Sequence, residues 1–555
     1  MDSPLDIPSD AQRSTKIFAL SRLLVALLVL SMMLTGCINS SGSSGYTASY
    51  VESKRLLAMS SLYEGYARNP GARDAMLGAA DRLAGEIDYS DGIKNEDIAV
   101  ARVKSFAAVY EGVARQPELD DQIIALALEL AGPTGNLAAF SPQVQAARLS
   151  SFETLWLAVA RNPEAKQNIL DAVTRLTGDI DYSHGIWDPA IYAARLRSFA
   201  GLYEAISIQP QIAEELIQLA LHITGPTKNP AFYSDDEEIA RLASFSRLYE
   251  AVARNPFAKR SLLDAVRRLS GEVDYRAGVS SLKLSQARME SFDTLYLAIA
   301  RQPEMADELI DFALQLTGPT GNTWAYWVSE QAARLRSFSG LYAAVARQPE
   351  AKQILLDAAK RLTGEFDYSA GVVNEALAAA RVASFETLYE GIARNPENAP
   401  ELIQLALDLT GPNVYESWLP RRVQNARLGS FAGLYEGIAR RPELAEFLIN
   451  TALELSGPTG DPSEYAPSAQ AARLEAFSGV YLAYARVPEE KQTILDAARR
   501  VAGQIDYSEG IRNYQVAGSR MLSLHIIYEG IARQPEISGE LIGLAEDLCG
   551  PEVLF

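Results

Sequence analysis

Cysteine and histidine are scarce in this chain, and their scarcity excludes several kinds of site. Only two cysteines, Cys37 and Cys549, occur among 555 residues, which is too few for a disulfide framework. The three histidines, His184, His222 and His525, have no second histidine or cysteine at ligand spacing. The sequence therefore indicates no zinc site and no Ser–His or Cys–His dyad. We predict no metal site, no cofactor and no catalytic residues, and we expect the protein not to be an enzyme.

Basic residues are also in the minority. The chain has 51 Lys and Arg residues against 70 Asp and Glu residues, which gives a net charge of −19. Nucleic-acid binding needs clustered lysine and arginine, so we expect no nucleic-acid partner. The acidity also disfavours broad attraction to anionic lipid headgroups. We interpret it as the charge of a solvated outer surface, with binding of a cation or a basic partner as the alternative.

Long apolar segments are absent except for one short run near the N-terminus. Arg13, Lys16 and Arg22 precede an apolar stretch at residues 23–34. This stretch is too short to cross a bilayer comfortably as a helix, and its arrangement is typical of a signal peptide. The residues that close it, Leu34-Thr35-Gly36-Cys37, resemble the lipobox of prokaryotic lipoproteins, bacterial or archaeal.

This resemblance implies a processed and lipidated N-terminus. Residues 1–36 would be removed as the signal peptide, and Cys37 would carry a diacylglyceryl group. Two acyl chains anchor a protein stably to a membrane. Residues 37–49 are rich in Ser and Gly and would form a flexible tether. We therefore expect an extracytoplasmic, membrane-anchored protein on the cell surface or facing the periplasm. The alternative is an uncleaved signal anchor, which would leave the rest of the chain on the same side.

The remainder of the chain, residues 50–555, repeats one pattern eleven times with a period of 46–47 residues. Each repeat has an arginine, followed in most repeats by phenylalanine four residues later and tyrosine eight residues later, and in all repeats by proline fifteen residues later. A period of this regularity is typical of helical-repeat architectures. The arginines are Arg55, Arg102, Arg148, Arg195, Arg241, Arg288, Arg334, Arg381, Arg427, Arg473 and Arg520.

The repeat around Arg148 predicts a pair of helices. Apolar residues recur at helical spacing over 149–159, and Asn162-Pro163 must end this helix because proline excludes the helical conformation for the residue before it. Pro163 suits the first turn of a second helix, whose apolar stripe covers 169–176, and Gly178 is placed to cap its end. We expect helices of roughly 15–20 residues, or roughly 22–30 Å in length.

One hairpin cannot bury both of its apolar stripes, whereas stacked hairpins can. We therefore predict an all-α fold, an α-solenoid of about eleven two-helix repeats. The period resembles that of HEAT and armadillo repeats, and the helix pairs resemble a lengthened tetratricopeptide repeat. This resemblance covers residues 50–555 and concerns architecture alone. At about 10 Å for each hairpin, the repeats predict an arc of about 110 Å.

Two kinds of loop join the repeats. Five repeats end in Gly-x-x-Asp-Tyr, here named Asp-Tyr loops, beginning at Gly85, Gly178, Gly271, Gly364 and Gly503; six end in Gly-Pro, here named Gly-Pro loops, beginning at Gly132, Gly225, Gly318, Gly411, Gly457 and Gly550. The two kinds alternate, except that the loops at 411 and 457 are both of the Gly-Pro kind. The alternation indicates a 93-residue double repeat as the duplicated unit. We interpret the Asp-Tyr loops as Asx-turns with a packed tyrosine rather than as calcium loops.

The repeated arginines have a structural interpretation. They share a helix face with the phenylalanine and tyrosine, and we expect them to bond carbonyls or acids of the neighbouring hairpin. Recognition of a carboxylate-bearing peptide is the alternative. In many repeats a glutamate such as Glu64 precedes an arginine such as Arg68 by four residues. These pairs would contribute about 0.3–0.5 kcal/mol each on the helix surface.

The Gly-Pro loops vary in sequence and are rich in aromatic residues, three of the five tryptophans among them. Loops on a rigid scaffold are a usual place for binding, and aromatic side chains there can stack on sugars or anchor a protein. The alternative is that they fold back over the helix ends. The predicted partner-binding residues are Trp324, Tyr326, Trp327, Tyr415 and Trp418.

These features predict a cell-surface, lipid-anchored helical-repeat scaffold that binds a protein or glycan partner. One alternative is a structural component of the cell envelope without a discrete ligand. A less favoured alternative is a carbohydrate-processing enzyme, which would need a carboxylate pair on the concave face. Nothing in the sequence selects such a pair.

Overall fold

The computed structural model describes residues 46–135, 140–279, 281–415 and 418–551. It is 79% helical, and the described residues contain no strand, which confirms the predicted all-α solenoid. Ala48–Phe555 form one compact unit. Cys37 and the predicted signal peptide lie outside the described residues. No helix among those described is both long and apolar enough to span a bilayer.

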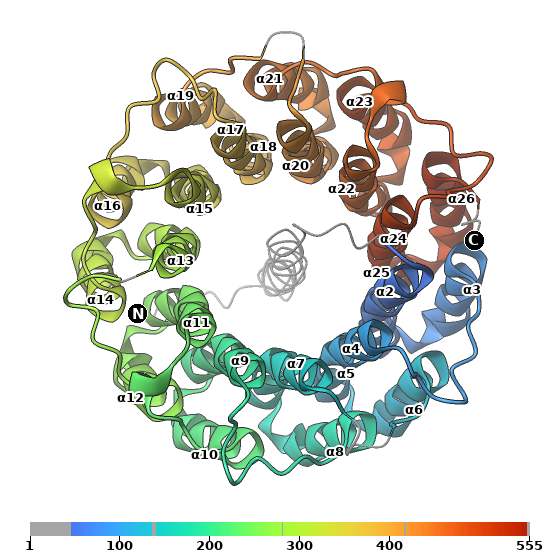
Figure 1. Cartoon of the computed structure of the whole chain (residues 1–555). Helices are drawn as coiled ribbons and strands as arrows, with labels where there is room; N and C mark the ends of the chain where they lie inside the picture. The colour runs from blue at the N-terminus through green and yellow to red at the C-terminus, as the bar shows by residue number, and fades with distance from the viewer. Residues whose placement is uncertain (1–45, 136–139, 280, 416–417, 552–555) are drawn as a thin grey trace, which may run out of the picture. The chain divides into compact units, whose positions relative to one another are not determined.

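The first helices of the repeats form an inner layer (Figure 1). Most are single helices of 20 residues, but breaks at Phe106, Ser384 and Leu524 divide three of them in two. The inner helices are α2 (Ala48–Arg68), α4 (Glu96–Ser105), α5 (Ala107–Arg115), α7 (Pro142–Arg161), α9 (Pro189–Ile208), α11 (Asp235–Arg254), α13 (Leu282–Arg301), α15 (Val328–Arg347), α17 (Glu375–Ala383), α18 (Phe385–Arg394), α20 (Arg421–Arg440), α22 (Pro467–Arg486), α24 (Tyr514–Ser523) and α25 (His525–Arg533).

The second helices form an outer layer and have 12 residues each, fewer than expected. The reason is that each hairpin proline first forms a three-residue 3-10 turn, such as η4 (Pro163–Ala165) before α8. The outer helices are α3 (Arg73–Ala84), α6 (Asp120–Ala131), α8 (Lys166–Thr177), α10 (Ala213–Thr224), α12 (Lys259–Ser270), α14 (Ala306–Thr317), α16 (Lys352–Thr363), α19 (Ala399–Thr410), α21 (Ala445–Ser456), α23 (Lys491–Ala502) and α26 (Ser538–Cys549).

Local chemistry explains where these helices end. Asn162 leaves the helical region, with φ −138° and ψ 81°, because Pro163 follows it. Gly178 ends α8 at φ 74°, a conformation that favours glycine because it has no Cβ. The glycine at the end of every outer helix likewise has a positive φ, which confirms the predicted caps.

The Asp-Tyr loops are Asx-turns, as predicted. The Asp181 Oδ1 atom accepts a hydrogen bond from the Ser183 backbone N–H at 2.8 Å, and the Tyr182 ring is buried. In the third copy, where arginine replaces this serine, the Arg276 N–H donates to Asp274 Oδ1 at 3.0 Å. The turn depends on the backbone N–H group, so the side chain at that position is free to vary.

The main core lies between the two layers. In the third repeat Phe152 and Trp156 of α7 and Ile169 and Leu176 of α8 are fully buried. The Phe152 and Trp156 rings meet edge to face at a centroid distance of 6.0 Å, a favourable geometry for aromatic pairs. Cys549 occupies a fully buried position at the end of α26, where it packs as a small core residue.

The solenoid closes into a ring and is not an open arc. The length of about 110 Å predicted for the arc is therefore a length measured along the ring. Figure 1 shows α2 and α3 beside α24, α25 and α26. The Asn69 side-chain N–H donates to the Ala532 carbonyl at 3.0 Å, just as Asn162 donates to the Ala114 carbonyl at 2.9 Å within the ring. Because the first and last repeats meet through the same contacts as internal neighbours, the ring has no exposed end.

Candidate binding surfaces

Each repeated arginine is buried where its hairpin meets the next one. The Arg195 guanidinium is fully buried; its Nε donates to the Thr224 carbonyl at 3.1 Å and its Nη2 to the Gly225 carbonyl at 2.9 Å. Its Nη1 donates to the Leu269 carbonyl of the following repeat at 2.9 Å. These bonds satisfy carbonyls that helix ends leave without partners. The prediction of a structural arginine that bonds carbonyls is confirmed, and for Arg195 these include a carbonyl of the neighbouring hairpin.

The bond to the next repeat is confined to repeats that end in a Gly-Pro loop. There Nη1 donates to an outer-helix carbonyl, in the pairs Arg102–Leu176, Arg195–Leu269, Arg288–Leu362, Arg381–Leu455, Arg427–Val501 and Arg520–Leu83. In the Asp-Tyr repeats the same Nη1 atom has no hydrogen-bond partner, at Arg55, Arg148, Arg241, Arg334 and Arg473. The Tyr182 ring lies 5.9 Å from the Arg148 guanidinium instead, a cation–π contact. The two loop kinds therefore make two different interfaces.

A second set of arginines, thirteen residues after the first, forms a belt with glutamates on the inner helices. The predicted pairing within one helix occurs, as in Arg68–Glu64 at 2.8 Å. The arginines also pair with the glutamate of the preceding repeat, in the pairs Arg115–Glu64, Arg161–Glu111, Arg254–Glu204, Arg301–Glu250 and Arg486–Glu436. Arg68 and Glu529 make the equivalent pair at 3.4 Å across the ring closure.

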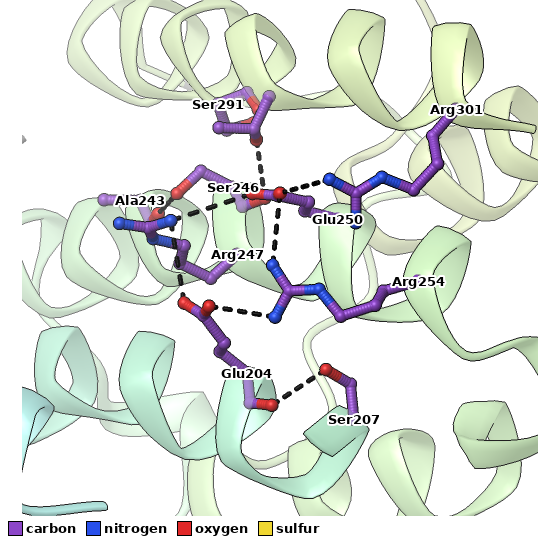
Figure 2. A network of polar contacts seen from close by, with 10 residues as sticks. Glu204, Ser207, Ala243, Ser246, Arg247, Glu250, Arg254, Ser291 and Arg301 are labelled. Carbon is purple, nitrogen blue, oxygen red and sulfur yellow. Dashed lines mark hydrogen bonds and ion pairs between the residues drawn. The ribbon is translucent and has the colours of Figure 1, made fainter. Parts of the chain in front are cut away.

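Between α9, α11 and α13 this belt becomes a buried network (Figure 2). Glu204, Arg247 and Glu250 are 2%, 4% and 7% exposed. Arg247 Nη1 lies 3.6 Å from Glu204 Oε2 and 3.7 Å from Glu250 Oε2. Arg254 Nη1 lies 2.9 Å from Glu204 Oε1, and Arg301 Nη2 lies 3.2 Å from Glu250 Oε1. The network thus joins three consecutive inner helices through paired charges.

The electrostatics of the network follow from burial and from these arginines. Burial opposes ionisation of Glu204, but Arg247 and Arg254 outweigh it and hold the pKa of Glu204 below its usual value. Burial raises the pKa of Glu153 on α7 to about 7, although Arg247 acts in the opposite direction. Burial likewise raises the pKa of Asp293 on α13 to about 6, against the opposing hydrogen bond from Ser339. Glu204 is therefore ionised at neutral pH, whereas Glu153 and Asp293 titrate near neutral pH.

We interpret the role of this network as structural: it holds three consecutive inner helices together. Its two most buried acids are each paired with arginine, which is a poor arrangement for a general base or a nucleophile. Among the described residues no group of three His, Cys, Asp or Glu side chains is placed to hold a metal ion. Sequence reasoning missed the network. A comparison of repeats could have found it, because Arg247 is the only charged residue at its position in the eleven repeats.

Glu386 provides a test of the inner-layer electrostatics. Burial, with Glu390 and Glu436 nearby, raises the pKa of Glu386 to about 8 from a usual value of 4.5. The folded state therefore binds more protons than the unfolded state between these values, so its stability falls as pH rises from 4.5 to 8. We expect Glu386→Gln, which mimics the neutral acid, to be more stable than wild type by about 1–2 kcal/mol at pH 9 and equal to it near pH 4.5.

The measurement is urea unfolding of both proteins at each pH. The control is Glu397→Gln, which alters an exposed glutamate of the same repeat and should show no such dependence. An equal difference between Glu386→Gln and wild type at both pH values would contradict the assignment.

The predicted loop residues divide into exposed and packed side chains. Trp327 and Trp418 are 71% and 72% exposed. Tyr326 is half-buried, with its ring 5.8 Å from the Phe366 ring, so it covers the neighbouring loop. Tyr415 is half-buried and donates its hydroxyl to the Val373 carbonyl at 3.1 Å. The backbone of Trp324 lies in η9 (Thr323–Ala325), and its side chain is outside the described part.

The exposed tryptophans lie on one edge of the ring. Both precede an inner helix, and in every repeat the inner layer begins at this edge. The Glu330 Oε2 atom accepts a hydrogen bond from the Trp327 N–H at 2.8 Å, which fixes the backbone of Trp327 at the start of α15. The two loops are two repeats apart, and Val373, 80% exposed, lies in the Asp-Tyr loop between them. These three exposed apolar side chains lie in three successive loops.

Other exposed apolar side chains lie outside the predicted set. On the same edge, Trp187 and Phe232 are 82% and 72% exposed. On the opposite edge Phe257 is 99% exposed in the hairpin turn η7 (Pro256–Ala258). Glutamate, glutamine or glycine follows the turn proline in every other repeat, so a comparison of repeats could have singled out Phe257. Comparison of the chain with protein-family models, curated proteins and solved structures finds no match.

Proposed function

We propose that this protein is a lipid-anchored, extracytoplasmic scaffold that binds a protein or a glycan through the aromatic side chains of its Gly-Pro loops. The observation that carries the proposal is the exposure of Trp327 and Trp418, at 71% and 72%, on loops between packed helices. Tryptophan is among the residues that most often anchor a partner, and loops on a rigid scaffold are a usual place for binding. The hydrogen bond from the Trp327 N–H to Glu330 fixes the Trp327 backbone at the start of α15, which limits the entropy lost on binding.

The lipid anchor rests on the sequence Leu34-Thr35-Gly36-Cys37 after a short apolar run. We expect Cys37 to be the first residue of the mature protein and to carry the lipid. Cys37→Ser should release the protein from the membrane fraction or leave it uncleaved, and mass spectrometry of the native N-terminus checks this. An unmodified Cys37 inside a longer native chain would refute the anchor without bearing on the binding loops.

The contact surface is tested by the double substitution Trp327→Ala and Trp418→Ala. We expect at least tenfold weaker binding to a partner captured from envelope extract, because exposed aromatic anchors often contribute 2 kcal/mol or more, roughly thirtyfold in Kd. Stability should change by no more than about 0.5 kcal/mol, because the side chains are largely outside the core. The measurements are calorimetric titration with the purified partner and thermal melting.

Trp187→Ala is the matched control, since Trp187 is even more exposed, at 82%, but belongs to an Asp-Tyr loop. It should leave binding unchanged. If the double variant melts much lower and binds normally once folded, the two tryptophans are cover for helix ends and the contact surface lies elsewhere.

The closed ring also bears on the structural alternative. A structural solenoid whose function depends on its length would grow by stacking further repeats on a free end. Here the first and last repeats pack against each other, so end-to-end growth would require opening the ring. This favours the binding scaffold over an extended envelope component. Sedimentation that showed long polymers of the full chain would reverse that preference.

A further inference from the structure

Six consecutive loops between repeats each present a large apolar side chain to solvent, in the loop or at the first residue of the following helix. They join α8 to α9, α10 to α11, α12 to α13, α14 to α15, α16 to α17 and α19 to α20. Each loop runs from the end of an outer helix to the start of an inner one, so all lie on one edge of the ring, here named the loop edge. The exposed side chains are Trp187, Phe232, Leu282, Trp327, Val328, Val373 and Trp418.

One position shows that the loops themselves do not require an apolar side chain. The ninth residue after the glycine of an Asp-Tyr loop is Lys94, Trp187, Val373 or Arg512 in the four copies that the structure describes, and all four side chains are exposed. Lysine and arginine are ordinary residues for such a position. Tryptophan and valine therefore reflect what this part of the edge contacts, and not how the loop folds.

Trp327 replaces a residue that would serve its helix better. In the equivalent loops Ser141 and Ser234 precede α7 and α11, and each serine hydroxyl accepts a hydrogen bond from a backbone N–H of the first helical turn, at Val144 and Glu237. The indole of Trp327 is a donor only and cannot accept such a bond. The start of α15 thus lacks a capping bond and has an exposed tryptophan in its place.

The N-terminal tether joins the ring at the same edge. The first inner helix, α2, begins at Ala48 on the loop edge, and Cys37 comes eleven residues earlier. A flexible chain of this length spans about 17–20 Å on average, whereas the inner helices make the ring roughly 30 Å deep. A lipid on Cys37 would therefore hold the loop edge, and not the opposite edge, nearest to the membrane.

The tether and the apolar loops lie across the ring from each other. Figure 1 shows α2 on one side of the ring and α13 and α15, in the middle of the run of apolar loops, on the other. A lipid beside α2 would hold one side of the ring and leave the other free to swing away. A second contact at the apolar loops would keep the whole loop edge against a bilayer, since two membrane signals anchor more firmly than one.

We infer that the loop edge lies on the surface of a phospholipid bilayer, with the exposed side chains of the apolar loops among the lipid headgroups; this rests on the lipid anchor of the proposed function. Tryptophan is enriched at membrane–water interfaces, because its ring is apolar and its N–H group bonds to water or headgroups. A protein or glycan that binds Trp327 and Trp418 would then be bound at the membrane surface.

The charges of the loop edge fit neutral headgroups. Near the tether the exposed Lys94 and Arg512 side chains have long stems that let their charged ends reach lipid phosphates. Asp181 and Asp274 of the apolar loops are exposed as well, and carboxylates are repelled by an anionic surface. We therefore expect a zwitterionic lipid such as phosphatidylcholine to suffice for the contact.

The test places a spin label on either edge of the full, lipid-anchored protein in phosphatidylcholine vesicles. Phe232→Cys carries the label on the loop edge, and Phe257→Cys carries it in a hairpin turn on the opposite edge; the native side chains are 72% and 99% exposed. Lipidation blocks Cys37, and Cys549 is fully buried. We expect the Phe232→Cys label to collide several-fold less often with a water-soluble nickel chelate than the Phe257→Cys label, and more often with oxygen, which concentrates in lipid.

A pair of substitutions then removes part of the contact. In the background of Trp187→Ser with Val373→Ser, the Phe232→Cys label should return to water, while melting stays unchanged because these side chains are 82% and 80% exposed. The matched control is Lys94→Ser with Arg512→Ser, which alters the same loop position beside the tether. It should leave the label among the headgroups, because the lipid on Cys37 already holds that side of the ring.

Equal collision of both labels with the nickel chelate overturns the inference. It is also overturned if the lipid-free Cys37→Ser protein forms dimers in sedimentation that Trp187→Ser with Val373→Ser dissociates, because a second copy then covers the loop edge. Weaker capture of a partner from envelope extract by that pair overturns it too, since these side chains then belong to the partner surface.

Mass spectrometry of Cys37 separates this inference from the proposed function. A lipidated protein whose Phe232→Cys label stays in water overturns the membrane contact and leaves the anchor intact. An unlipidated Cys37 overturns both. Binding of the partner through Trp327 and Trp418 is measured independently, by the double substitution described above.

Discussion

Replacement of Arg195 by methionine is expected to lower the free energy of unfolding by about 3–5 kcal/mol, comparable with the loss of one member of a buried charged pair. The Arg195 side chain is fully buried, and it donates to carbonyls of Thr224, Gly225 and Leu269 in two repeats. Methionine fills similar space but donates no hydrogen bond. The loss stays below the sum of the separate bonds, because the cost of burying the charge disappears as well.

The control for this prediction lies two residues away on the same helix. Arg197 is exposed, so Arg197→Met should change stability by less than about 1 kcal/mol. Urea unfolding followed by circular dichroism at one pH compares the two variants with wild type. Equal unfolding midpoints for the two variants would show that the repeated arginines, here named the arginine ladder, do not hold neighbouring hairpins together.

Replacement of Gly340 by alanine is expected to destabilise the ring by about 2–3 kcal/mol, in the range of overpacked cores. A Cβ on Gly340 of α15 would lie 2.0 Å from the Asp293 carbonyl oxygen of α13 and 2.2 Å from its Oδ1. The carbonyl belongs to a helix backbone and cannot turn aside, so α13 and α15 must separate. That displacement would disturb the packing of two inner helices along their length.

Gly429→Ala is the matched control, because Gly429 lies on the inner helix α20 with nothing within 4 Å of its Cβ position. Alanine is about 1 kcal/mol better than glycine in a helix interior, so this variant should be more stable than wild type. The two substitutions are chemically identical, and they are expected to change the free energy of unfolding in opposite directions, as measured by thermal or urea unfolding. A stabilising Gly340→Ala would refute the close approach of α13 and α15.

Much of the fold could be predicted from single repeats. Pro163 ends a helix through its effect on the residue before it, and Gly178 ends one by adopting a positive φ. Both effects are local to the backbone, so the sequence alone predicts them. The arginine ladder was predictable in kind, because a buried arginine must find acceptors. Which carbonyl each guanidinium reaches was not, since the partner of Arg195 at Leu269 belongs to the next repeat.

The candidate surfaces were less predictable. Trp327 and Tyr326 are adjacent in one loop, yet Trp327 is exposed and Tyr326 packs near Phe366. From composition alone, both residues are equally expected to be exposed. Only the path of the loop decides which of the two side chains is exposed and which is packed. The buried network around Arg247 escaped prediction for a similar reason. Glu204, which pairs with Arg247, and Arg301, which pairs with Glu250, lie on neighbouring hairpins.

By itself the sequence determined the helices, the hairpin turns, the number of repeats and the two kinds of loop. All of these depend on interactions within a few residues or on a period that can be counted. Only the tertiary structure decided that the solenoid closes. Closure requires the small rotation between neighbouring hairpins to add to a full turn, about 33° for each of eleven repeats. That rotation depends on how side chains of two stacked hairpins fit, including the close approach at Gly340.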